Sequence, residues 1–157
     1  MAQIKDVTLQ IKPGSSNDNK EVTVGFKLAF STTEAGKSFR YDISLRGEDL
    51  PGDKESPIII GEEVLSDFSF GAFGLFIGFP SKLITAKAGE QQFTEIRNIS
   101  TKKLNEDPGG MSVTVNGLPL ELKHADEIFA EATLMKGDQI TLLVDKKRSN
   151  TVTGFFG

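Results

Sequence analysis

Apolar and polar residues alternate with a period of two along most of the chain. The clearest run spans residues 21–30, and its apolar positions are Val22, Val24, Phe26, Leu28 and Phe30. Alternation over this length is typical of a half-buried antiparallel strand. The same pattern predicts further strands at residues 4–12, 38–46, 82–88, 128–134, 140–144 and 151–156.

Residues 111–122 carry the best hairpin signal in the chain. Met111, Val113 and Val115 alternate with polar residues, Asn116-Gly117 follows, and a second alternating run begins at Leu118. Asn-Gly supplies the two positive φ angles of a type I′ turn. Because Pro119 has no backbone N–H to donate, we predict that its strand is an edge strand or is bulged.

These segments predict an all-β chain of about nine or ten strands with at most one short helix. Turns every 8–15 residues and no alternation of strands with helices favour an antiparallel β-sandwich, immunoglobulin-like or jelly-roll-like. The length of 157 residues fits a single domain over residues 1–157. Cys and Trp are both absent, so the Cys–Trp–Cys spacing of true immunoglobulin domains is missing and no family is assigned.

The stretch Ser66–Pro80 is the most apolar in the chain and contains five of its twelve Phe residues. We interpret it as a single strand at the centre of the core, with a bulge near Gly71 where the apolar phase changes. Large side chains occupy the odd positions from Phe73 to Phe79 and small ones most of the even positions. Both faces of this strand therefore need cover.

Two sources of cover are open. Residues 89–105 can be helix or strand, and Phe93, Ile96 and Ile99 can fold over the bare face. Alternatively, a second copy of the chain covers it in a homodimer, with Phe73, Phe76 and Phe79 at the interface.

Charge argues against several partners. The net charge is −4, and the only basic clusters are Lys102-Lys103 and residues 146–148, which we interpret as solvated turns. Nucleic acids and anionic membrane surfaces both require a basic face, so neither is the expected partner. The chain leaves the cellular compartment open.

The residues offer no clear catalytic chemistry. The only histidine, His124, lies in a polar turn, and Cys is absent, so neither a thiol nucleophile nor a zinc site is indicated. No Gly-rich phosphate motif precedes a helix. We therefore predict a protein that is not an enzyme and needs no cofactor.

One loop, residues 46–55, gathers four carboxylates: Glu48, Asp49, Asp53 and Glu55. Carboxylates on a loop at the end of a sandwich suit calcium, although Lys54 interrupts the group and a solvated loop is the simpler interpretation. The expected function is a non-catalytic binding or structural module acting through contacts with another protein or with itself. The alternative is a glycan-binding or calcium-assisted adhesion module.

Overall fold

A computed structural model describes residues 1–48, 63–71, 78–79, 81–105, 110–123, 125–137 and 142–156. These residues form thirteen strands and one four-residue helix, and all strand pairs are antiparallel. The prediction of an all-β antiparallel sandwich is confirmed. The strands outnumber the nine or ten expected because several are pieces of only two to four residues. No helix in these ranges is long and apolar enough to cross a membrane.

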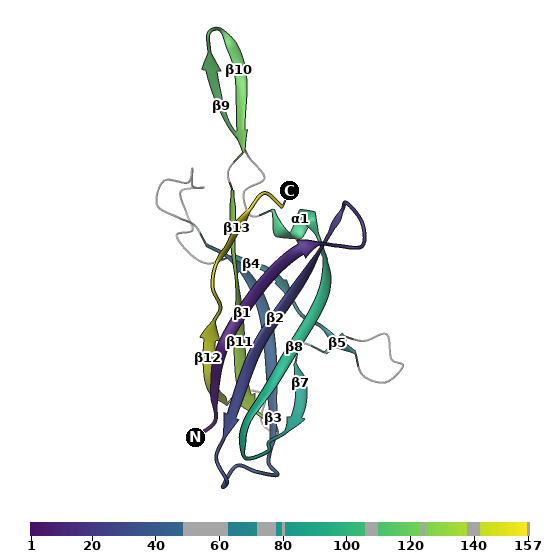
Figure 1. Ribbon diagram of the computed structural model, residues 1–157, viewed down its shortest axis with the longest axis vertical. Coiled ribbons are helices and arrows are strands. Elements are labelled where there is room, and N and C mark those ends of the chain that lie inside the picture. The colour runs from purple at the N-terminus through teal and green to yellow at the C-terminus, as the bar shows by residue number, and fades with distance from the viewer. Residues whose placement is uncertain are drawn as a thin grey trace.

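Two sheets form the body (Figure 1). The smaller has the order β1-β2-β8, with bounds Gln3–Pro13, Asn19–Phe30 and Gly89–Ser100. The larger has the order β12-β11-β3-β4, with bounds Leu143–Arg148, Asp126–Lys136, Ser38–Gly47 and Glu63–Asp67. In addition, β13 (Val152–Gly154) pairs with β11, and β7 (Lys82–Thr85) pairs with β3.

The core lies between these sheets, where the predicted alternation places it. All apolar positions predicted to face inward on β2 and β3 are buried, as are those on β11. Phe26 of β2 meets Tyr41 of β3 edge-to-face, with ring centroids 4.9 Å apart. Period-two burial on β2 and β3 is therefore the basis of the fold, and β11 adds its even-numbered positions to the same core while also burying Phe129 and Glu131 on its other face.

An irregularity in β1 brings one more residue into the core. The register with β2 shifts between Lys5 and Thr8, and Asp6 takes a φ of 52°. This bulge lets both Ile4 and Val7 face inward, although simple alternation would place them on opposite faces.

Side chains close the open edge of β1. The amide of Asn150 accepts from Leu9 N–H at 2.9 Å and donates to Leu9 C=O at 3.2 Å. Asp145 of β12 accepts from Ile4 N–H at 2.7 Å. These contacts satisfy backbone groups that a sheet edge otherwise leaves exposed and tie the two sheets together.

The prediction of one continuous Phe-rich strand is wrong. Phe70–Gly71 (β5) pairs antiparallel with Gly78–Phe79 (β6), and Phe70 lies opposite Phe79. Two residues that pair antiparallel cannot belong to one straight strand, and composition alone did not reveal this. Phe68 and Phe70 are buried in the core, but its centre is formed by β2, β3 and β11.

Residues 89–105, for which the sequence allowed either helix or strand, are a strand over most of their length. β8 continues to Ser100 and is followed by the short helix α1, Thr101–Leu104. Neighbouring residues of a strand face opposite ways, so Ile99 is buried while Ile96 is exposed. The expectation that Phe93, Ile96 and Ile99 together cover another strand is therefore wrong.

The basic run at residues 146–148 is not a solvated turn. β12 continues to Arg148, and its charges pair across the outer face of the larger sheet. Lys146 contacts Glu131 at 2.9 Å, and Arg148 contacts Glu48 at 2.8 Å. Alternating ion pairs let a highly charged segment complete a sheet edge.

The predicted hairpin is confirmed. β9 (Gly110–Val115) pairs with β10 (Leu118–Lys123), and Asn116 and Gly117 have φ values of 51° and 78°. Both angles match a type I′ turn. Figure 1 shows this hairpin projecting away from the sandwich along the long axis of the molecule.

Candidate functional site

The projecting hairpin exposes an aliphatic face. Val115 lies opposite Leu118, and Val113 lies opposite Leu120, so these four side chains share one side of the hairpin. Leu118 is 71% exposed, and Val115 and Leu120 are each about half exposed. Ser112 and Thr114 occupy the other side. The two sides therefore differ sharply in polarity.

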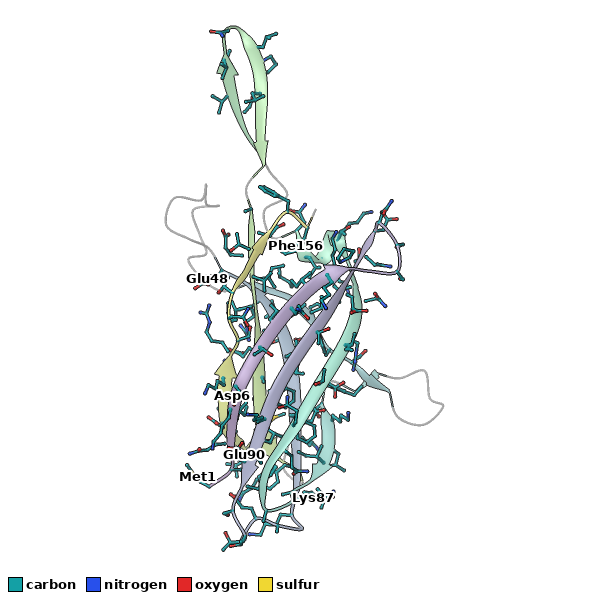
Figure 2. All side chains as sticks on the ribbon, in the orientation of Figure 1. Met1, Asp6, Glu48, Lys87, Glu90 and Phe156 are labelled. Carbon is teal, nitrogen blue, oxygen red and sulfur yellow. The ribbon has the colours of Figure 1, made fainter. Side chains whose placement is uncertain are left out.

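This face makes no contribution to the core. Among the hairpin side chains that the structure describes, residues 112–120, none belongs to the core or to the partly buried side chains that pack against it. In Figure 2 the side chains of the hairpin stand clear of those of the sandwich. A two-stranded hairpin is marginally stable alone, and contiguous exposed apolar surface is characteristic of interaction sites. The hairpin is the first candidate site.

A second cluster centres on Glu95 of β8, which is buried although it is charged. Its carboxylate accepts a short hydrogen bond from the hydroxyl of Tyr41. Lys82 Nζ lies 2.8 Å from Oε1, and Arg97 Nη1 lies 3.3 Å from Oε2. Burial acts to raise the pKa of Glu95, but hydrogen bonds from Lys82 and Tyr41, together with the positive charges of Lys82 and Arg97, outweigh it, so the net pKa is lowered.

Tyr41 and Glu95 superficially form a phenol with an adjacent base. Burial raises the pKa of the Tyr41 hydroxyl, and its carboxylate partner raises it further. Tyr41 is also fully buried, so no substrate can reach its oxygen in this arrangement. The cluster fits a structural role instead: an inward-pointing charge on the edge strand β8 disfavours association with another sheet edge.

A third feature is a polar depression of about 360 Å³ on the outer face of the larger sheet. Asp42, Arg46, Asp67, Glu131 and Lys146 are among its lining residues. Glu131 pairs with Arg46 at 3.0 Å. Burial is the main cause of the raised pKa of Asp42, which is partly offset by a hydrogen bond from Thr133. The depression therefore presents paired charges and hydroxyl groups to solvent.

Of the predicted calcium ligands, only Glu48 falls within the described residues. Its carboxylate accepts from Arg148 at 2.8 Å and from Thr151 at 3.1 Å, and the bond from Arg148 is the main reason that its pKa is lowered. Figure 2 labels Glu48 beside the larger sheet. Asp49, Asp53 and Glu55 lie outside the described residues. In the part of the chain that the structure describes, no three His, Cys, Asp or Glu residues gather as metal ligands.

The predicted interface is described only in part. Phe79 belongs to β6, opposite Phe70. Phe73, Phe76 and His124 lie outside the described residues, so the structure does not test them.

Sequence reasoning overlooked all three features: the exposed hairpin face, the Glu95 cluster and the polar depression, whose lining comes from four strands, β3, β4, β11 and β12. Glu95 lies on the same face of β8 as Phe93, Arg97 and Ile99. A carboxylate on a face that also carries buried apolar residues would have indicated a buried charge, but only once the segment was known to be a strand. The hairpin was predicted, but nothing in its pattern indicated that its apolar face lies outside the core.

Comparisons with known proteins give the fold alone. No family model and no curated protein matches the chain. Among solved structures it is similar to the β-glucuronidase 2 of Bacteroides uniformis covalently bound to cyclophellitol-6-carboxylate aziridine, with a TM-score of 0.53 and 12% identity. A second structure of Bacteroides uniformis β-glucuronidase gives 0.52 and 12%. Each match covers 98% of this chain but only 14% of the enzyme chain.

Proposed function

We propose that this chain is a non-catalytic binding module whose partner is a protein that contacts the β9–β10 hairpin. The observation that carries the proposal is the exposed aliphatic face formed by Val113, Val115, Leu118 and Leu120. Removing this face from water is favourable at roughly 25 cal/mol for each Å² of apolar area. Nothing in the described part of the chain covers this face, so we assign its burial to a partner.

The shape of the site favours a protein over a small ligand. Small molecules bind in concave pockets that surround most of their surface, whereas this face lies on a projecting arm. The polar clusters elsewhere support a non-catalytic role. Glu48 and Glu131 are each paired with an arginine side chain, and the Tyr41–Glu95 pair is buried.

Photo-cross-linking in cells of the natural host tests the proposal. A photoreactive amino acid replaces Leu118, and in a matched control it replaces Ile96, an exposed apolar residue on the body of β8. We expect a discrete covalent adduct with a protein from position 118 and none from position 96. Equal labelling from both positions, or no adduct from position 118, contradicts the proposal.

A glycan-binding module is the second candidate. It is supported by the sandwich fold shared with a segment of β-glucuronidase chains and by the depression lined by Asp42, Asp67 and Lys146. Carboxylate, ammonium and hydroxyl groups suit the hydroxyl and carboxyl groups of a uronic-acid sugar. The described residues offer this site no exposed aromatic platform, because Tyr41 and Phe129 are both fully buried.

Calorimetric titration with glucuronic-acid oligosaccharides, with and without millimolar calcium, tests this candidate. We expect saturable binding that Asp67→Asn weakens and that Glu90→Gln, on β8 of the smaller sheet, leaves unchanged. Thermal melts run in parallel detect calcium itself, because binding at a hundredfold excess over Kd adds about 2.7 kcal/mol to stability. If the titration gives no binding heat and calcium leaves the melting temperature unchanged, both the glycan-binding and the calcium-binding proposals are rejected.

A further inference from the structure

The hydrogen-bond pattern of the hairpin makes its two outer edges unequal. In a type I′ turn the first residue accepts from the fourth, so Val115 and Leu118 are a hydrogen-bonded pair. Hydrogen-bonded and non-hydrogen-bonded pairs alternate along an antiparallel ladder. The pairs Thr114–Pro119 and Ser112–Glu121 are therefore non-hydrogen-bonded. The backbone groups of these four residues point away from the hairpin, toward its outer edges.

One outer edge is blocked and the other is open. On β10 the outward position nearest the turn is Pro119, which has no N–H to offer another strand. On β9 both outward positions, Ser112 and Thr114, keep their N–H and C=O groups. β9 pairs with β10 and with no other described strand. An added strand can therefore use both outward positions only beside β9, because of the two outward positions opposite them on β10, Pro119 and Glu121, only Glu121 has an N–H.

We propose that β9 pairs antiparallel with β9 of a second copy of this chain about a two-fold axis, giving a four-stranded sheet in the order β10-β9-β9-β10. The inference goes beyond the proposed function: the second copy pairs with the edge of β9, and the two aliphatic faces, joined into one surface of the dimer, stay exposed for the protein partner proposed above. Val113 lies on the axis opposite the partner's Val113, and Ser112 lies opposite the partner's Thr114. This register joins outward-pointing residues in hydrogen-bonded pairs and keeps the two aliphatic faces on one side of the sheet.

The sequence of β9 suits pairing with itself. Gly-Met-Ser-Val-Thr-Val contains no charged residue, so two copies meet without like charges in apposition. Ser112 and Thr114 place hydroxyl groups opposite each other on the polar side, a favourable cross-strand combination. A four-stranded sheet with a hydrophobic face is also more stable than an isolated two-stranded hairpin, which is only marginally stable.

Pro119 limits the assembly to two copies. In the four-stranded sheet both outer strands are β10, and each presents Pro119 at its free edge. The same residue that blocks one edge of the hairpin therefore stops the sheet from adding further strands. The contact is isologous and closes on itself, giving a dimer and not a fibre.

The dimer is expected to be weak when its only contact is a six-residue edge. Stable interfaces bury about 1,200–2,000 Å² in total, and one pair of short strands falls below this range. The association is therefore measured by sedimentation equilibrium from micromolar to millimolar protein, where a concentration-dependent rise in mass toward that of two chains is expected.

Two proline variants isolate the edge. Thr114→Pro removes an outward N–H from β9 and spares the bonds to β10; Glu121→Pro does the same on β10, whose edge is already blocked. We expect Thr114→Pro to raise the dimer Kd about tenfold or more, because two symmetry-related hydrogen bonds are lost. Glu121→Pro leaves the Kd near that of the wild type. Equal effects of the two variants overturn the proposed edge.

Charged substitutions at Val113, which lies on the two-fold axis, test the proposed register without introducing proline. Val113→Lys and Val113→Glu each place like charges opposite each other and are expected to be monomeric, whereas an equimolar mixture dimerises. A mixture that stays monomeric overturns the register. A wild type that is monomeric up to millimolar concentration overturns self-pairing, while the protein-binding proposal stands if position 118 still cross-links to a different protein.

Discussion

Replacing Phe26 with alanine is expected to lower the free energy of unfolding by about 3–5 kcal/mol, the usual range for removing a buried aromatic ring. Phe26 is fully buried at the centre of β2. Its ring meets Tyr41 edge-to-face at 4.9 Å and stacks on Phe93 at 5.5 Å, so one truncation removes contacts to both sheets. Urea denaturation followed by circular dichroism measures the change.

Ile96→Ala is the matched control for this experiment. Ile96 is apolar and lies on the neighbouring strand β8, but it is about half exposed, so its truncation is expected to change stability by about 0.5 kcal/mol or less. A loss below about 1 kcal/mol for Phe26→Ala would show that the centre of the core lies elsewhere.

The fold was predictable where one face of a long strand is buried. On β2 and β3 every second residue is apolar, and this period determined which side chains enter the core; on β11 it identified the core-facing positions but not the burial of Phe129 and Glu131 on the other face. The turn at Asn116-Gly117 was predictable for a different reason, because only a few residue types tolerate two consecutive positive φ angles. Both signals are local, so no knowledge of tertiary structure was needed.

The failures concern segments whose structure depends on distant contacts. In the sequence, Phe70 and Phe79 resemble parts of one strand, because a run of apolar residues does not show where the chain turns back on itself. The charges of β12 resembled a turn because their partners, Glu48 and Glu131, are remote in sequence. The candidate site fared similarly: the aliphatic face of the hairpin was visible in the sequence, but its distance from the core was not.

Removing the carboxylate of Glu95 is the second substitution with a large expected effect. Glu95→Ala leaves the buried hydroxyl of Tyr41 without its acceptor and separates Lys82 and Arg97 from their shared partner. An unsatisfied buried donor costs about 1–3 kcal/mol. The two cations are partly exposed and add less, so we expect a total loss of about 2–4 kcal/mol.

Glu90→Ala provides the matched control on the same strand. Glu90 pairs with Lys5 at 2.8 Å, the same distance as Glu95 to Lys82, but both groups of that pair are exposed. An exposed ion pair is worth about 0–1 kcal/mol. Similar losses for the two variants would show that burial and the Tyr41 hydroxyl add nothing, and would contradict the prediction for Glu95.

The pH dependence of the same variant pair gives the prediction a second readout. The folded-state pKa of Glu95 is lowered relative to the unfolded chain, where a glutamate titrates near 4.3. Its ionised form therefore stabilises the fold fully above about pH 4.3, and this stabilisation is lost as the pH falls through the lower folded value. Glu95→Gln keeps an acceptor for Tyr41 but cannot ionise. The stability gap between the wild type and Glu95→Gln should be widest at neutral pH and narrow below about pH 4.3; a gap that widens on acidification would show that burial, not the surrounding donors, controls this carboxylate.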